Sequence, residues 1–268
     1  MPAFFAGFAC LLGSLLLCAA AGAAQAAGAA TELPAVRELD PVHVNAMRNP
    51  EVRRYKAILA GLDSFDEHRK MAPAVDRLYF RLEPRRKDEL PGPPAARLVG
   101  DGGFTLPLPL DAAGRFAVPR SEAARDANSE LELNKKRRVY RIMPDIRTPG
   151  LGPNQRRLGD LRLECKVMVA IAKEEAPWYI LVAANGVLRT SDWCGIFTAD
   201  KAEWAAHVGQ PLREAVLREG DRSAALKVKG DAFEVALAEP GWSDEAVIEL
   251  SFAEPLTGTA GETPRTAP

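Results

Sequence analysis

The sequence predicts a mainly β protein: two β-sandwich-like modules preceded by one amphipathic helix. Short apolar stretches with a period of two recur along the chain, and turn-forming Gly and Pro residues separate them. Only one long stretch has the spacing of an amphipathic helix. A chain of 268 residues suggests one or two domains. We expect a β-sandwich module over 75–173 and a second β-rich module over 174–253, with a boundary near 173–177.

The first 26 residues differ from the rest in composition. A small and apolar run over 4–18 leads to Ala24-Gln25-Ala26, which has the pattern of a signal-peptide cleavage site. A signal peptide over 1–26 predicts a periplasmic or secreted protein. No Lys or Arg precedes the run, and the run is long enough to span a bilayer, so an uncleaved anchor is the alternative. Membrane contact is expected only through such an uncleaved signal.

Residues 27–74 are expected to form a linker and then the helix, over about 50–70. Asn49 suits the N-cap, and Pro50 suits the first helical position. The apolar residues that recur at helical spacing are Val52, Tyr55, Ile58, Leu59, Leu62 and Phe65. Gly61 costs the helix about 1 kcal/mol relative to Ala. We expect this stripe to cover the end of a sheet.

The first module begins with an alternating strand over 78–82. A hairpin is expected over 98–120, in which a tight turn at 111–114 joins strands at 104–106 and 115–118. Short strands are expected over 131–142. Pro and Gly then predict a loop over 145–160, shaped by its backbone and not by a ligand.

The strongest strand pattern covers residues 161–171. Apolar residues occupy every odd position: Leu161, Leu163, Cys165, Val167, Val169 and Ile171. A strand with this alternation would turn Cys165 toward the core.

The second module is expected to begin with strands on both sides of an Asn185-Gly186 turn. A further strand is expected over 194–198. The capping-box spacing of Asp200 and Glu203 predicts a short helix over 201–207.

The end of the second module has two further signals. Gly230-Asp231 predicts a hairpin between apolar stretches at 226–229 and 233–237. A last strand is expected over 247–252. Residues 254–268 are rich in Pro, Thr, Gly and Ala and predict a disordered tail.

Two cysteines remain after the predicted signal is removed. An even pair in an exported chain predicts a disulfide between Cys165 and Cys194. Closing a loop of this length contributes about 3–4 kcal/mol in the chain-entropy model. The alternative is a nucleophilic Cys194.

The charge of the chain is balanced, with 35 Lys and Arg against 36 Asp and Glu, so no nucleic-acid partner is expected. One concentration of positive charge stands out. It comprises Lys135, Lys136, Arg137, Arg138, Arg156 and Arg157. These residues could bind an acidic envelope polymer or lipid head groups, although solvent-facing positions in strands and loops explain them as well.

No catalytic, cofactor-binding or metal-binding residue is assigned from the sequence, and no enzymatic activity is expected. The histidines, His43, His68 and His207, lack the spacing of a zinc site. One alternative is a hydrolase in which Ser191, Asp192 and His207 meet in space. Another is a structural subunit that adds an edge strand to a partner.

Residues 103–120 resemble the strand–turn–strand core of carboxypeptidase-regulatory-like modules, which are transthyretin-type β-sandwiches of exported proteins. The resemblance extends over about 75–172. The segments 147–151 and 157–165 are also similar to exported bacterial proteins of no known function. The resemblance implies a non-catalytic accessory or binding module and carries no site residue. We therefore expect a non-catalytic envelope protein that binds another envelope protein or a polysaccharide.

Overall fold

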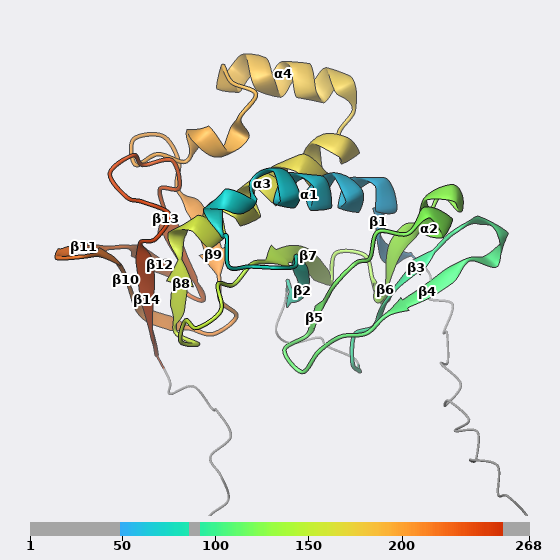
Figure 1. The fold of residues 1–268 in the computed structure, drawn as a ribbon, viewed down its shortest axis with the longest axis horizontal. Coiled ribbons are helices and arrows are strands. Elements are labelled where there is room, and N and C mark those ends of the chain that lie inside the picture. The colour runs from blue at the N-terminus through green and yellow to red at the C-terminus, as the bar shows by residue number, and fades with distance from the viewer. Residues whose placement is uncertain (1–48, 86–91, 254–268) are drawn as a thin grey trace, which may run out of the picture. The chain divides into compact units, whose positions relative to one another are not determined.

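The computed structural model describes residues 49–85 and 92–253 (Figure 1). Within them, 14 strands form four antiparallel sheets, which confirms a mainly β fold. The predicted signal peptide, most of the linker, His43 and the predicted tail lie outside the described residues.

Two sheets come mostly from the first half of the chain. One is ordered β1 (Pro50–Arg54), β6 (Glu130–Lys136), β3 (Ala96–Val99) and β4 (Thr105–Leu108). The other is ordered β5 (Arg115–Phe116), β2 (Tyr79–Pro84) and β7 (Tyr140–Asp145). Their inner faces share one core with the short helix α2 (Glu122–Asp126) and with α1 (Tyr55–Glu67).

The other two sheets surround a second core. One is ordered β11 (Arg222–Ala225), β10 (Leu212–Glu219), β14 (Val247–Phe252) and β8 (Gln155–Arg157). The other is ordered β12 (Lys227–Lys229), β13 (Ala232–Val235) and β9 (Trp204–His207). The predicted hairpin at Gly230-Asp231 is confirmed, because β12 and β13 pair across it and Gly230 has a φ of 64°.

The predicted strand over 161–171 is wrong: this segment lies in the helix α3 (Leu158–Glu175). The alternation arises because two helical stripes interleave. Leu163, Val167 and Ile171 contribute to the first core. Leu158, Leu161 and Cys165 contribute to the second. A helix buried on two sides thus produces the period of a strand.

The packing of β8 and α3 shows how the segments on the two sides of the predicted boundary at 173–177 are connected. Residues 155–157, expected to lie in a loop of the first module, instead form the strand β8 and pair with β14. One stripe of α3 contributes to the first core and the other stripe contributes to the second. The described residues all fall within one compact unit, and α3 contributes to both of its cores.

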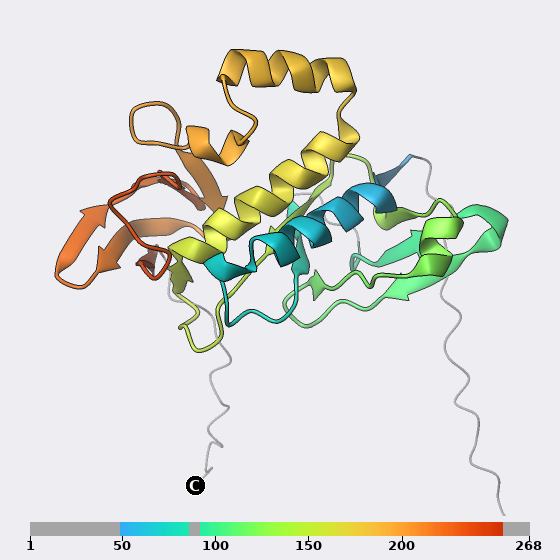
Figure 2. The ribbon, with the colours of Figure 1, turned by 45° about the horizontal axis from the view of Figure 1, so that its top comes forward.

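The predicted amphipathic helix is α1, but it begins at Tyr55 and not near Pro50. Asn49 has a φ of 62° and does not cap it, and residues 50–54 pair with β6 as an edge strand. The apolar stripe from Tyr55 to Phe65 is buried, as expected. It packs largely against α3, which lies beside α1 in Figure 2.

The contact between α1 and α3 explains the unfavourable Gly61. A Cβ atom there would lie 2.8 Å from Cγ1 of Ile171 and 3.3 Å from Cγ1 of Val167. We expect Gly61→Leu to lower the free energy of unfolding by about 1–3 kcal/mol, because the larger side chain forces the two helices apart. Urea denaturation measures this loss, and Ala60→Leu, at a half-buried neighbouring position, is the control. Unchanged stability of Gly61→Leu would contradict the tight packing.

Three further expectations are corrected. Residues 178–188 form the helix α4 (Trp178–Leu188), so Asn185-Gly186 lies within a helix and not in a hairpin turn. Cys194 lies in the short 3₁₀ helix η3 (Trp193–Ile196), where a strand is expected. The expected helix over 201–207 is instead the strand β9, because residues 204–207 pair with β13.

The expected hairpin over 98–120 forms only in part. Its turn is present: Gly114 has a φ of 72° and donates its N–H to the Asp111 carbonyl at 2.9 Å. The strands on either side do not pair with each other, since β4 pairs with β3 and β5 pairs with β2. Strands β2 and β14 lie where the sequence predicts them.

Candidate functional site

The helix α4 stands apart from the sheets in both ribbon views (Figures 1 and 2). Its 11 residues include no charged side chain. Five of its large apolar side chains are exposed, with these fractions: Trp178 76%, Tyr179 57%, Ile180 46%, Val182 64% and Val187 82%. The one other exposed large apolar residue of the described chain is Val52, at 38%. A cluster of this kind on a protein surface commonly marks a contact site.

The exposed residues share one side of α4. At about 100° per residue, they cover roughly 200° of the helix surface. In sequence they are Trp178, Tyr179, Ile180, Val182, Ala183, Gly186 and Val187. The half-buried residues cover the opposite side and are Leu181, Ala184, Asn185 and Leu188. The helix therefore has an inner side toward the protein and an apolar outer side toward solvent.

A disulfide closes the loop that carries α4. Cys165 in α3 is bonded to Cys194 in η3, with their Cα atoms 6.0 Å apart, so the predicted pairing is confirmed. The position of Cys165 differs from the prediction, since it faces the second core from a helix and not from a strand. We refer to residues 166–193, between the two cysteines, as the tied loop.

Non-covalent contacts brace the tied loop as well. Lys166 forms an ion pair of 2.8 Å with Asp192 beside the disulfide. Lys173 donates to the Ser191 carbonyl at 2.6 Å, and its Nζ lies 5.3 Å from the centre of the Trp193 ring. The indole N–H of Trp193 donates to Oδ1 of Asn185 at 2.8 Å, which satisfies the amide oxygen of α4. These contacts hold the helix in place while its outer side stays uncovered.

Every acidic side chain of the tied loop forms an ion pair, whereas only some of its basic side chains do. Glu174 pairs with Lys56 at 2.7 Å, and Glu175 pairs with Arg53. Burial tends to raise the pKa of Asp192, but Lys166 and the backbone N–H groups of Cys194 and Gly195 together hold the pKa below its ordinary value. Among the described residues, neither Lys173 nor Arg189 forms an ion pair. The loop and its partners therefore carry net positive charge next to α4.

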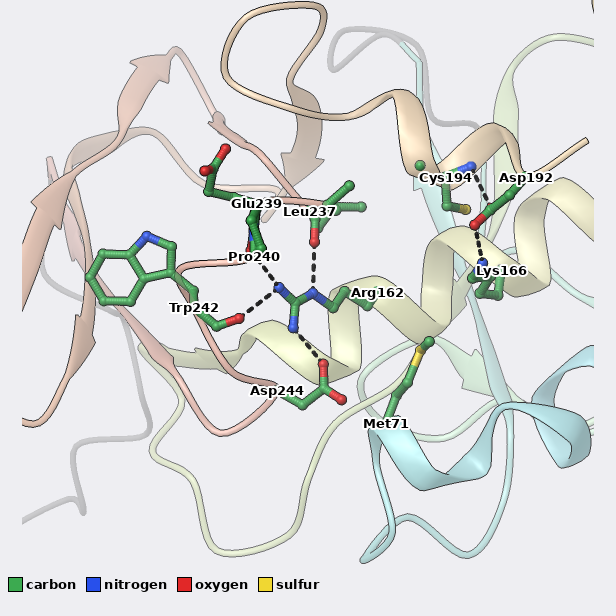
Figure 3. A pocket seen from close by; sticks show the side chains of 12 residues that line it. Met71, Arg162, Lys166, Asp192, Cys194, Leu237, Glu239, Pro240, Trp242 and Asp244 are labelled. Carbon is green, nitrogen blue, oxygen red and sulfur yellow. Dashed lines mark hydrogen bonds and ion pairs between the residues drawn. The ribbon is translucent and has the colours of Figure 1, made fainter. Parts of the chain in front are cut away.

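A pocket of about 400 Å³ lies below the disulfide, between α3 and the segment 237–244 (Figure 3). Arg162 lines it, but its guanidinium is already satisfied. It donates to the carbonyls of Leu237 at 2.7 Å and Trp242 at 2.9 Å, and it pairs with Asp244 at 2.6 Å. Arg162 therefore fixes the segment 237–244 to α3, and the pocket offers no uncompensated polar group from this residue.

The residues of the alternative hydrolase site are not in contact. Asp192 interacts with Lys166 and with the backbone N–H of Cys194. His207 instead lies with Nδ1 3.3 Å from Asp231 and with Nε2 3.5 Å from Arg141. Cys194 is in the disulfide and has no free thiol. In residues 49–85 and 92–253, no group of three or more His, Cys, Asp or Glu side chains could hold a metal ion.

The predicted basic patch does not form as one surface. Lys136, Arg137 and Arg138 are exposed, but Lys135, Arg156 and Arg157 are buried. Lys135 donates to the Gly92 carbonyl at 2.8 Å.

Arg156 and Arg157 instead neutralise acids close to α3. Arg156 pairs with Glu164 at 2.8 Å, and Arg157 pairs with Glu245. Asp160 accepts from both the N–H and the hydroxyl of Thr148 at 2.8 and 2.7 Å. Side-chain bonds, and not the backbone alone, therefore organise the segment 145–160, which includes β8 and the start of α3 as well as a loop.

Asp145, buried near Arg156, makes the stability of the fold depend on pH. Burial would raise the pKa of Asp145, but the charges of Arg147 and Arg81 outweigh it and hold the pKa below its ordinary value. A depressed pKa contributes stability above the unfolded-state pKa of about 3.9, and this is lost as the pH falls through the folded-state pKa. We expect Asp145→Asn to be less stable than the wild type at neutral pH, with a smaller loss below about pH 4.

Urea denaturation between neutral and acid pH measures the effect of Asp145→Asn. Asp76→Asn, at an exposed position, serves as the control. Parallel stability curves for the wild type and Asp145→Asn would contradict an ionised, stabilising Asp145.

Comparison with known proteins does not extend this description: no protein-family model, curated protein or solved structure matches the chain. The resemblance to carboxypeptidase-regulatory-like modules therefore stays a prediction. Across the described residues, every helix is too short or too polar to cross a membrane.

The sequence interpretation missed α4 as a surface. The available signals were Pro177, which suits the start of a helix, and 11 uncharged residues after it, more than most strands contain. That the outer side of this helix is uncovered follows only from the structure.

Proposed function

We propose that the chain acts outside the cytoplasm as a non-catalytic binding protein of the cell envelope, with α4 as its docking surface. The observation that carries the proposal is the exposed apolar side of α4, held outward by the tied loop. Leaving such a surface in water is unfavourable, so a protein that retains it is expected to cover it during its work.

Two features support a location outside the cytoplasm. Disulfides persist in oxidising compartments, and the tied loop depends on one. The apolar run over 4–18, followed by Ala24-Gln25-Ala26, is typical of an export signal. N-terminal sequencing of the protein from a periplasmic fraction should begin near Ala27, and an intact Met1 on cytoplasmic protein would contradict export.

Hydrogen exchange can locate the surface that becomes covered. We expect isolated envelope membranes to slow amide exchange in α4 (Trp178–Leu188) more than elsewhere. Slowing confined to β11 (Arg222–Ala225), which is at the edge of its sheet, would favour the edge-strand alternative. Slowing confined to the surroundings of His207 would favour a substrate site. Unchanged exchange in α4 would contradict the proposed docking surface.

A further inference from the structure

We infer that the partner of α4 is a lipid bilayer, and that the helix lies in the membrane interface with its outer side toward the acyl chains. The inference rests on the proposed docking role of α4. It departs from the sequence expectation that membrane contact occurs only through an uncleaved signal.

The width of the apolar surface favours lipid over a protein groove. A helix that docks in a groove presents a stripe of anchors at positions i, i+3, i+4 and i+7, and polar residues border the interface. The outer side of α4 instead covers roughly 200°, and the polar atoms of its side chains are those of Trp178 and Tyr179. A bilayer can surround the whole of such a surface.

The size of the surface also disfavours a second copy of this chain. The five exposed large side chains offer on the order of 600 Å², since an aromatic side chain alone presents about 150–250 Å². A stable interface buries about 800 Å² on each partner. About 600 Å² is at the low end of the area that stable interfaces bury on each partner, so a symmetric dimer through α4 alone would have a small interface.

The residues at and beyond the ends of α4 suit the head-group region of a membrane interface. Trp178 and Tyr179 lie side by side at one end, with ring centres 6.1 Å apart, and such rings favour the level of the lipid head groups. Arg189 follows the other end, and Lys173 precedes the first. The nearby acids Glu174 and Glu175 are neutralised by Lys56 and Arg53. This net positive charge complements anionic head groups.

The length of α4 fixes how the helix lies. Eleven residues extend about 16 Å, roughly half the thickness of the hydrocarbon layer. The helix is therefore too short to cross the bilayer and would lie parallel to its surface, as interfacial helices do. The tied loop holds the helix beyond the sheets, so that this orientation leaves the folded body in water.

Vesicle flotation with the folded, disulfide-bonded chain tests the inference. We expect binding to phosphatidylcholine vesicles that contain about one-third phosphatidylglycerol, and weaker binding to phosphatidylcholine alone. The double variant Val182→Asn, Val187→Asn should weaken binding at least tenfold, because it places two amides in the apolar contact. Val52→Asn, the same change at the exposed valine outside α4, is the matched control and should bind normally.

Arg189→Gln tests the electrostatic contribution to vesicle binding. It should weaken binding to the anionic vesicles and leave binding to phosphatidylcholine unchanged. The unfolding midpoints of all these variants should equal that of the wild type, since the altered side chains are exposed.

Three results would overturn the bilayer as partner. One is the absence of flotation with either vesicle. Another is flotation that the double variant at 182 and 187 does not weaken. The third is a lipid-free dimer that the same variant disrupts, which would identify a second copy as the occupant. Protection of α4 by envelope membranes but not by vesicles refutes the lipid inference and leaves the docking proposal standing; no protection by either refutes both.

Discussion

Replacing Arg156 by Met is expected to lower the free energy of unfolding by about 3–5 kcal/mol, because it leaves a buried carboxylate without its counter-charge. Arg156 is only 2% exposed, and its Nη2 lies 2.8 Å from Oε1 of Glu164. The same Nη2 donates to the Ile146 carbonyl at 3.3 Å. The contact fixes β8 to α3, the helix that contributes to both cores.

The loss in Arg156→Met should depend on pH in a direction that identifies its cause. Burial raises the pKa of Glu164, and the charge of Arg156 opposes that rise. Without Arg156 the pKa of Glu164 rises further, so the folded state binds a proton more tightly than the unfolded state does. A raised pKa makes stability fall as the pH increases toward the folded-state pKa. Arg156→Met should therefore be less damaging near pH 5 than near pH 8, as urea denaturation at both pH values would show.

A second substitution distinguishes the lost charge from lost packing. Oε1 of Glu164 also accepts the N–H of Ile146 at 2.8 Å, so the replacement must keep an acceptor. Glu164→Gln does so and removes the negative charge. We expect Arg156→Met with Glu164→Gln to recover part of the stability lost in Arg156→Met. A double variant less stable than the single one would contradict the electrostatic explanation.

The sequence predicts a strand correctly where a single cause, such as burial of one face against one core, determines the pattern of apolar residues. In β2, the buried Phe80 and Leu82 alternate with half-buried residues because only one face meets the first core. The hairpin at Gly230-Asp231 is local, since two residues determine the turn. The disulfide could be predicted from cysteine count and export alone, which require no secondary structure.

The errors have a common physical origin in tertiary packing. In α3, two buried stripes face different cores, and their overlap imitates strand alternation. In α4, an unbroken apolar run suggests a buried element, because its uncovered position depends on the tied loop and not on local sequence. The basic residues of β8 suggest a solvent-facing patch, because the sequence does not show that the fold places Glu164 of α3 and the distant Glu245 next to them.

Replacing both cysteines, Cys165→Ala with Cys194→Ala, is expected to lower the free energy of unfolding by about 3–4 kcal/mol. The bond closes a loop of 29 residues, so its removal gives the unfolded chain more conformational freedom. Urea denaturation of the double variant beside the wild type measures this loss. Lys166→Gln is the matched control. It breaks the ion pair between Lys166 and Asp192 next to the disulfide, and such a partly exposed pair contributes only about 0–1 kcal/mol.

The same pair of variants tests why the bond is there. If the disulfide holds α4 outward, its loss should accelerate amide exchange over the tied loop more than in α1, which is anchored by the first core. Lys166→Gln should leave that exchange nearly unchanged. Equal acceleration in α1 and α4 would mean that the bond supports the whole fold without a special effect on the loop. Two alkylatable thiols in unreduced protein would contradict the bond itself and make Cys194 available as a nucleophile.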